Sequence, residues 1–272
     1  MNSEININEQ QAAIAFSKQA DVFDNLYAEN TIIKYKRLRV RTHLLQFLSP
    51  GNKILELNSG TGDDAIWLAR QGFQIHATDI SAGMQEILYQ KIKDTGFEKV
   101  VTQEICSFTQ LNLLQQKGPY HFIFSNFAGL NCTGEIKKVL SSLSALLYPG
   151  GIITMVILPK FCLWEFLLIF KGKWKTATRR LFNRNGAKAR VEGTYFKCWY
   201  YNPSFIIQEL QNDFDLLCIE GLCTIVPPSY IEHFAEKHPV IYTFLKEKED
   251  RWKTKWPWKY IGDYYIISFR KK

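Results

Sequence analysis

A strand, a glycine turn and a helix follow one another between residues 53 and 71, and this segment constrains the chain more than any other. The apolar run 53–57 leads into Asn-Ser-Gly-Thr-Gly and then into a helical stretch that ends at Gly72. Gly60 and Gly62 have no Cβ, so the backbone can turn sharply and a ligand can lie against the main chain. The start of the helix directs free N–H groups toward such a ligand. The segment therefore predicts a ligand-binding strand–turn–helix unit.

Six further apolar or β-branched runs continue the pattern set by this first strand. They lie at 74–78, 100–105, 121–125, 152–157, 214–219 and 263–269. Helical patterns precede or separate them, at 8–48, 63–71, 84–93, 204–211 and 240–253. Strands that alternate with helices at this spacing are typical of a mostly parallel sheet with helices on both faces. The sequence therefore predicts a Rossmann-like α/β fold around a seven-stranded sheet.

Positive charge is concentrated in one stretch of the chain. The formal net charge of the 272 residues is +8. The stretch 171–197 contains a single acidic residue, Glu192, and nine basic residues, namely Lys171, Lys173, Lys175, Arg179, Arg180, Arg184, Lys188, Arg190 and Lys197. Its local excess equals the charge of the whole chain, so the remainder is balanced. An acidic partner is expected to contact this stretch.

Composition excludes several classes of protein. Hydrophobic residues make up 46% of the chain, which is enough apolar surface to exclude a disordered protein. No apolar run reaches the roughly 20 residues that a spanning helix needs, and the first 30 residues show no secretory core, so we expect a cytoplasmic protein. The six cysteines form no Cys-x-x-Cys pair and have no histidine at ligand spacing. We therefore expect reduced thiols and no metal site.

The acids around the glycine turn indicate which ligand it suits. The pattern Gly-x-Gly-x-x-Ala at 60–65, with Asp79 downstream, also satisfies the dinucleotide fingerprint. However, Glu56 ends the first strand, and Asp63 and Asp64 occupy the first helical turn, where a diphosphate would meet negative charge. Acids in a first turn also complement the helix dipole without any ligand. The acid at the strand end favours a cationic ligand over a diphosphate.

At this point the sequence resembles a known family. The segments LELNSGTGDDAIWLA and GFQIHATDIS resemble the class I S-adenosylmethionine-dependent methyltransferases, in the subgroup whose loop reads Glu-Leu-Asn-x-Gly-Thr-Gly-Glu-Asp-Ala. The resemblance extends over nearly the whole chain, through NTIIKYKRLRV, FIFSNFAGLNC, LLYPGG and GDYYIISF. Asn58 replaces the first glycine of the broader family's loop, and asparagine tolerates unusual backbone angles better than most residues.

The resemblance implies a binding site for S-adenosylmethionine. Four residues would line the methionine part of the cofactor: Glu56, Asn58, Gly60 and Gly62. Asn126 and Phe127 would lie near the sulfonium. Tyr27 and Arg37 would act as lids, with Arg37 a candidate for the cofactor carboxylate, although an arginine on the surface of an amphipathic helix explains Arg37 equally well.

The same resemblance implies the contacts of the nucleoside. Asp79 would accept hydrogen bonds from both ribose hydroxyls, and Ile80 with Met84 would pack on the adenine face. Cys106 and Ser107, just past the third strand, would meet the adenine edge. Because the acid that many relatives have after this strand is missing, we expect the backbone to supply the adenine contacts.

Methyl transfer from a sulfonium is an in-line displacement, so the protein's main task is to align the reactants and exclude water. No dedicated general base is evident. By residue type the candidates for a catalytic group are His233, Tyr195 and Tyr200, and Tyr264 and Tyr265 are further candidates to line the acceptor cavity. Whether oxygen or carbon is methylated stays open.

The βα alternation divides the chain into three parts. Residues 1–160 contain the N-terminal helices and the cofactor-binding half of the α/β domain, 161–201 form an inserted cap, and 202–272 form the remainder with a second insertion at about 226–258. The cap joins an apolar block to the basic stretch. Such a segment can cover an apolar pocket or lie on a membrane surface through 161–197. Either arrangement favours an apolar acceptor, small or lipid-like, and the basic residues suit an anionic one.

Three other functions compete with a small-molecule methyltransferase. Nucleic acid is disfavoured as a partner, because the fourth strand lacks the Asn/Asp-Pro-Pro-aromatic signature of base-amino methyltransferases. A nicotinamide-dependent oxidoreductase is disfavoured by Glu56 and the two aspartates of the first helical turn. A non-catalytic cofactor-binding protein that docks on a membrane or a partner through 161–197 remains an alternative.

Overall fold

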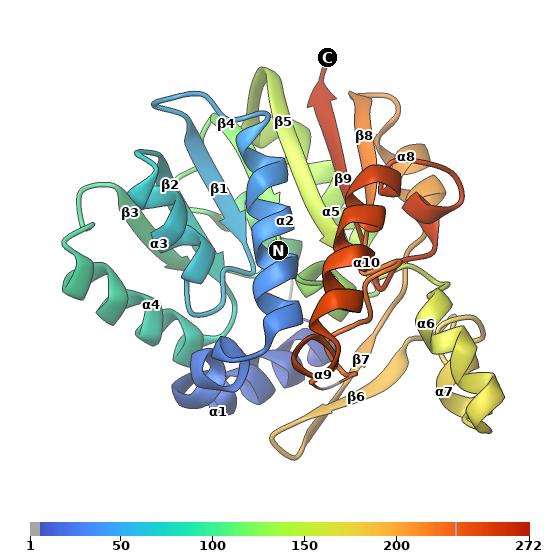
Figure 1. Ribbon diagram of the computed structural model, residues 1–272. Coiled ribbons are helices and arrows are strands. Elements are labelled where there is room, and N and C mark those ends of the chain that lie inside the picture. Colours follow the sequence, from blue (N-terminus) through green and yellow to red (C-terminus); the bar gives the residue numbers. More distant parts are fainter. Residues whose placement is uncertain (1–5, 232) are drawn as a thin grey trace.

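A seven-stranded sheet forms the centre of the molecule in this computed structural model, which describes residues 6–231 and 233–272. In chain order its strands are β1 (Lys53–Leu57), β2 (Gln74–Asp79), β3 (Val101–Ile105), β4 (Tyr120–Ser125), β5 (Leu147–Ile157), β8 (Phe214–Leu222) and β9 (Tyr264–Lys271). Their order across the sheet is β3-β2-β1-β4-β5-β9-β8 (Figure 1). The strand β9 runs antiparallel to β5 and β8, whereas the pairs from β3 to β5 are parallel. The predicted fold class is confirmed.

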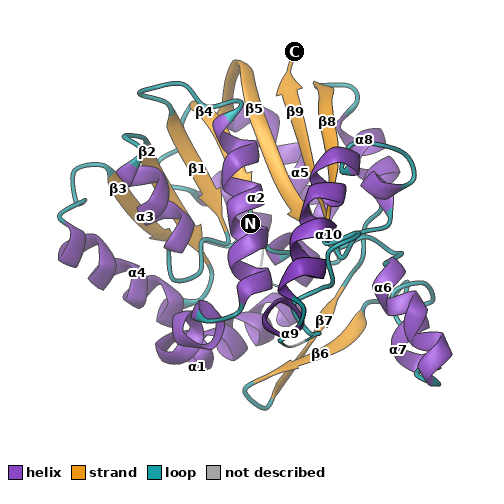
Figure 2. Cartoon of the chain, in the orientation of Figure 1, coloured by secondary structure: helices purple, strands orange, loops and turns teal. Residues whose placement is uncertain are grey.

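Helices cover both faces of this sheet (Figure 2). The longer ones are α1 (Ile7–Ala28), α2 (Thr31–Leu45), α3 (Asp63–Arg70), α4 (Ala82–Thr95), α5 (Ile136–Leu143), α8 (Pro203–Leu210) and α10 (Pro239–Trp252). Short helical turns are α6 (Leu163–Phe166), α7 (Trp174–Thr178) and α9 (Phe234–Lys237), with 3₁₀ turns at Phe108–Leu113, Gly129–Cys132, Ser144–Leu146, Leu167–Lys171 and Trp258–Tyr260.

The two faces of the sheet form separate cores, because successive strand side chains point to opposite sides. Leu55 and Ile123 pack in the core that includes residues of α5 and α8. Ile54 and Phe122 pack in the core that includes residues of α2, α3 and α4. Strands buried on both faces read as continuous apolar runs, which is why the sequence revealed them.

The helical pattern at 8–48 forms two helices, α1 and α2. Asn30 interrupts it and caps α2, where its side chain accepts hydrogen bonds from the backbone N–H groups of Ile32 and Ile33 at 3.0 Å. This break allows α1 to lie near the lower ends of β1 and β2 in Figure 1 while α2 packs along one face of the sheet. The capping asparagine therefore marks the point where α2 begins after α1 has ended.

The first insertion combines short helices with a two-stranded hairpin. Its strands β6 (Ala187–Val191) and β7 (Thr194–Cys198) are antiparallel, and Glu192 and Gly193 at their turn both have positive φ. The hairpin packs against α1 through Phe16 and Phe196, whose ring centroids are 5.7 Å apart. No helix in the described part of the chain is long and apolar enough to cross a membrane.

Candidate active site

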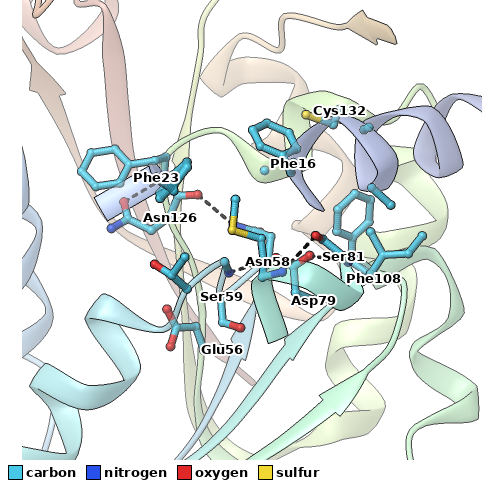
Figure 3. A pocket seen from close by; sticks show the side chains of 18 of the residues that line it. Phe16, Phe23, Glu56, Asn58, Ser59, Asp79, Ser81, Phe108, Asn126 and Cys132 are labelled. Atoms are coloured by element: carbon cyan, nitrogen blue, oxygen red, sulfur yellow. Dashed lines mark hydrogen bonds between the residues drawn. The ribbon is translucent and has the colours of Figure 1, made fainter. Parts of the chain in front are cut away.

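A cavity of about 160 Å³ lies where β1, β2 and β4 end beneath α1. Figure 3 shows Glu56 and Asp79 on one side of it and Phe16 from α1 on the other. The predicted cofactor residues that line this cavity are Arg37, Glu56, Asn58, Gly60, Asp79, Ile80, Met84, Asn126 and Phe127. These residues come from four distant parts of the sequence, and parallel strands bring them together because their carboxyl ends share one edge of the sheet.

The glycine turn has the backbone geometry that its sequence predicts. Gly60 and Gly62 have φ of +55° and +76°, where side chains with a Cβ are strained. Gly62 precedes α3 without lining the cavity, and a Cβ there would lie 2.1 Å from the side chain of Leu88. Gly60 instead faces open space and lines the cavity. A ligand can therefore approach the main chain at Gly60.

Asparagine at position 58 ties the ends of β1 and β4 together. Asn58 has a φ of +49°, as expected of a residue that replaces glycine. Its Oδ1 accepts a hydrogen bond from Ser125 Oγ at 2.6 Å, and its Nδ2 donates to the carbonyl of Asn126 at 2.9 Å. A Cβ on Gly129 would lie 2.1 Å from Asn58 Cγ, so glycine is required opposite this side chain.

Glu56 is a buried acid with an unused oxygen. Its Oε2 has no hydrogen-bond partner among the described residues. Burial raises its pKa well above the usual value, and the nearby Asp64 raises it further, while Arg41 and Arg37 oppose the shift. Asp64 itself accepts a hydrogen bond from Arg41 Nε at 2.8 Å. A cation in the cavity would satisfy Glu56, so this acid fits the ammonium or sulfonium of a cofactor such as S-adenosylmethionine.

Asp79 organises the turn from the end of β2. Its Oδ2 accepts a hydrogen bond from the N–H of Gly60 at 2.9 Å, and its Oδ1 accepts one from the N–H of Ser81 at 2.8 Å. Burial raises the pKa of Asp79, and hydrogen bonds from backbone N–H groups partly offset that rise. The carboxylate keeps further lone pairs for hydroxyl donors, which fits a ribose.

The part of the cavity lining that follows β3 differs from the prediction, which placed Cys106 and Ser107 there. Neither Cys106 nor Ser107 lines the cavity, and Phe108 stands there instead. Ser107 Oγ donates a hydrogen bond of 2.5 Å to Glu9, a buried acid on α1 that does line the cavity. Thr109 donates to the same carboxylate at 2.9 Å.

Glu9 was missed by the sequence analysis. Its second oxygen accepts a hydrogen bond of 2.9 Å from Thr133 Oγ1, so one carboxylate joins α1 to two loops. The sequence did offer a signal: Ala12 and Phe16 lie three and seven positions after Glu9, so this acid falls on the same apolar face of α1.

The three candidate catalytic residues lie away from this cavity. His233 is exposed at the start of α9, and Tyr195 is exposed on β7. Tyr200 is buried beneath Arg180, whose guanidinium carbon lies 5.3 Å from its ring centroid, and burial raises the pKa of its hydroxyl. None of the three lines the cavity. The side chain of Tyr27 lies outside the described residues.

A second cavity of about 290 Å³ adjoins the first. It is lined by Phe16, Phe23, Ile33, Lys36, Arg37, Phe127, Ser229 and Tyr264. Phe16, Phe23, Arg37 and Phe127 line both cavities. Phe127 and Tyr264 meet edge to face with centroids 6.1 Å apart. Of the two tyrosines expected at an acceptor cavity, Tyr264 lines this second cavity, whereas Tyr265 is buried in the core.

The expected cap covers neither cavity. As far as the described residues go, none of 161–201 lines either one, and α1 and α2 cover them instead. The hairpin of this insertion packs on α1, which already occupies the space next to the strand ends. Covering these two cavities therefore does not explain the apolar and basic composition of 161–197.

Part of the basic stretch is structural. Arg180 is buried and donates to Glu165 at 2.6 Å and to Asp263 at 2.8 Å. Arg179 also donates to Glu165 at 2.6 Å. Cys162, Glu165 and Asp263 offer closely spaced ligand atoms, but Arg180 already supplies the positive charge there.

The strand order and the glycine turn are those of the class I S-adenosylmethionine-dependent methyltransferase fold, and acids line the cavity at the ends of its strands. Residues 54–151 match the family model described as a methyltransferase domain. The chain therefore matches a methyltransferase domain over residues 54–151 and shares its fold with solved S-adenosylmethionine-dependent methyltransferases.

Solved structures share the fold at low sequence identity. The [4+2]-cyclase SpnF superposes with a TM-score of 0.64 at 14% identity, covering 98% of this chain and 97% of that one. The geranyl diphosphate C-methyltransferase of Streptomyces coelicolor A3(2) has a TM-score of 0.56 at 12% identity, covering 87% and 79%. These likenesses establish the fold alone.

Curated relatives match about half of this chain. The demethylmenaquinone methyltransferase of Bacillus cytotoxicus is 25% identical over 146 residues, which are 53% of this chain and 60% of the relative. The ubiquinone/menaquinone biosynthesis C-methyltransferase UbiE of Wigglesworthia glossinidia brevipalpis is 32% identical over 161 residues, covering 54% and 61%. The match thus spans about three fifths of the length of these relatives.

Proposed function

We propose that this protein transfers the methyl group of S-adenosylmethionine to an apolar small molecule, at an oxygen or a carbon atom. The observation that carries the proposal is the pair of adjoining cavities. The first is lined by Glu56 and Asp79, and half of the residues that line the second are aromatic. A cationic cofactor and an apolar acceptor can then meet at Phe127, which lines both.

The residues of the first cavity divide the work of holding the cofactor. Bound there, the cofactor supplies an electrophilic methyl group on a cationic sulfur. Glu56 compensates positive charge, and Asp79 accepts hydrogen bonds from hydroxyls while it keeps the turn at Gly60 in place. Ile80, Met84 and Phe108 offer apolar surface for a base. Because Gly60 has no side chain and faces open space, the cofactor can approach the main chain closely there.

The residues between the cavities exclude water from the reacting atoms. Phe16 and Phe23 of α1 and Phe127 after β4 form this part of the lining. An in-line displacement depends more on aligned reactants and on the exclusion of water than on acid–base assistance. Rigid aromatic side chains align the reactants and exclude water.

Apolar acceptors are also the substrates named for several relatives. The names of the Bacillus and Wigglesworthia proteins refer to quinones, and the Streptomyces structure contains geranyl diphosphate. The names of the Wigglesworthia and Streptomyces proteins specify C-methylation, which supports a carbon atom of an acceptor with a large apolar part. Screening hydrophobic phenols, quinones and lipids with labelled cofactor would decide between oxygen and carbon.

A nicotinamide cofactor is disfavoured by the same cavity. Glu56 and Asp64 are buried near the turn, where a dinucleotide would place its diphosphate. Calorimetric titration with S-adenosylhomocysteine beside NADH tests the assignment. We expect micromolar binding of the thioether and none of NADH. Binding of NADH alone would overturn the proposal, and binding of neither would favour a non-catalytic role.

Contact with an anionic membrane surface is a separate part of the proposal. Phe170, Trp174 and Phe182 of the first insertion are 83%, 62% and 79% exposed, and they lie among exposed lysines at 171, 173 and 175. Such a mixture suits lipid head groups. Co-sedimentation with vesicles of phosphatidylglycerol, compared with phosphatidylcholine, tests it, and equal or absent binding at low salt would remove it.

A further inference from the structure

Lys36 occupies an unusual position in the wall of the second cavity. It lies on α2, and its side chain is only 5% exposed. Its Nζ lies 4.8 Å from the ring centroid of Tyr264 and 5.8 Å from that of Phe127. Burying an ammonium is costly unless charge or hydrogen bonds compensate it. The two aromatic faces supply part of that compensation.

The remaining contacts of Lys36 leave hydrogen-bonding capacity unused. One N–H donates to Ser229 Oγ at 3.1 Å. The nearest carboxylate oxygen, Asp263 Oδ2, is 3.9 Å away, which is beyond hydrogen-bond distance. The other oxygen of Asp263 already accepts a hydrogen bond from Arg180 at 2.8 Å. An ammonium has three donors, so Lys36 can donate to a ligand in the cavity.

The second cavity combines cations with aromatic walls and has no base. Its lining includes Lys36 and Arg37 but no aspartate, glutamate or histidine among the described residues. Arg37 is already paired with Asp63. Asp263 and Tyr264 also face Lys36. The buried thiol of Cys223 interacts with it as well: burial raises the pKa of this thiol, and the positive charge of Lys36 partly offsets that rise.

We propose that the second cavity binds its acceptor as an oxyanion, a hydroxyarene or enol in its ionised form, and that Lys36 Nζ donates the hydrogen bond that holds this anion. The proposal rests on the proposed function and names the acceptor class for the same site. The hydroxyl proton goes to solvent before methyl transfer, since the lining offers no base to take it. Ionisation makes both the oxygen and the conjugated ring carbons nucleophilic.

Bonds and electrons balance for methylation at oxygen and for methylation at carbon. An electron pair from the oxyanion, or from a ring carbon conjugated to it, forms the new bond to the methyl carbon. The carbon–sulfur bond breaks, and its pair remains on sulfur. For carbon methylation the methylated ring loses its proton to water once the product has left the cavity, and aromaticity returns. Lys36 stays protonated throughout as a positioning and charge-stabilising group.

Two ionisable probes test the proposal on the full chain in the presence of saturating S-adenosylhomocysteine. The probes are 4-nitrophenol, followed by the absorbance of its phenolate, and 2-naphthol, followed by its fluorescence. We expect each bound probe to ionise at least one pH unit lower than the free probe, a tenfold change in its acid dissociation constant. We also expect 2-naphthol to bind at least tenfold more tightly than 2-methoxynaphthalene, which cannot ionise.

Variants assign this effect to Lys36. In Lys36→Met the shift in ionisation should disappear, whereas Lys36→Arg should retain part of it. Lys34→Met is the matched control, because Lys34 lies on the same helix with a side chain 60% exposed and should leave the shift unchanged. The measurement on the unaltered protein needs no variant, so it stands even if Lys36→Met does not fold.

The outcomes separate this inference from the proposed function. Absence of S-adenosylhomocysteine binding to the unaltered protein would overturn the proposed function. If that ligand binds but neither probe does, or if bound probes ionise as they do in water, the oxyanion proposal is wrong. A Lys36→Met protein that shifts the probes as the unaltered protein does would remove Lys36 from it.

Discussion

The N–H of Gly60 donates a hydrogen bond of 2.9 Å to Oδ2 of Asp79, so the acid that ends β2 also supports the glycine turn that follows β1. The two residues are 19 apart in sequence: Gly60 lies in the turn between β1 and α3, and Asp79 ends β2, the parallel neighbour of β1. One carboxylate therefore shapes the backbone of the site and offers its remaining lone pairs to a ligand.

Asp79→Ala should weaken binding of S-adenosylhomocysteine by about tenfold or more. A hydrogen bond to a charged group contributes about 1.5–3 kcal/mol, and the loss of the Gly60 contact loosens the turn as well. Calorimetric titration measures the affinity. Asp94→Ala, an exposed acid on α4, is the matched control and should bind as the unaltered protein does. Unchanged affinity in Asp79→Ala would show that the ribose lies elsewhere.

Glu56→Gln should stabilise the free protein and weaken the cofactor complex. Burial raises the pKa of Glu56 well above 4.5, so the folded protein retains a proton that the unfolded chain has lost. The free energy of unfolding consequently falls as pH rises above about 4.5, and the glutamine variant should lack this loss. Thermal unfolding between pH 5 and 8, with and without S-adenosylhomocysteine, measures both effects. A variant with the same pH dependence as the unaltered protein would contradict the burial argument.

Arg180→Met should destabilise the protein by about 3–5 kcal/mol, because it leaves the buried carboxylates of Glu165 and Asp263 short of positive charge. Burial raises the pKa of Glu165, but hydrogen bonds from Arg179 and the charge of Arg180 outweigh it, and the net pKa is lowered. Urea unfolding measures the loss. Arg184→Met removes an exposed charge from the same stretch and should change the stability by less than about 0.5 kcal/mol. Equal stability of the two variants would refute a structural role for Arg180.

Glu9→Ala should release α1 from the rest of the site. Its carboxylate accepts hydrogen bonds from Ser107, Thr109 and Thr133, and alanine would leave all three hydroxyls without this partner. We expect faster hydrogen exchange in α1 and about tenfold weaker binding of S-adenosylhomocysteine. Asp21→Ala changes an exposed acid on the same helix and serves as the control. Exchange in α1 as slow as in the control would argue against this tether.

Local sequence signals predicted many of the residues that line the first cavity. The strand before the glycine turn, the glycines at 60 and 62 and the acid at 79 all occur within one strand–turn–helix–strand unit. Their backbone requirements are local, because positive φ and strand ends depend on residues a few positions apart. The order of the elements then brings Glu56, Asp79 and Asn126 to one edge of the sheet.

The cover over the site could not be derived in the same way. The composition of 161–201 suited a cap, yet α1 covers the cavities and the insertion packs outside it. Which amphipathic segment lies over a sheet edge depends on shape and on the turn at Asn30, and composition records neither.

By itself the sequence determined the α/β class, the seven strands and the residues around the glycine turn, since these follow from periodicity and backbone preferences along short stretches. Only the tertiary structure decided that Phe108 rather than Cys106 or Ser107 lines the first cavity, that Glu9 lines it from α1, and that Lys36 lines the second cavity. Arg180 likewise became structural only through Asp263, a residue 83 positions away. Contacts between distant residues depend on how whole elements pack, and that information is spread over the entire chain.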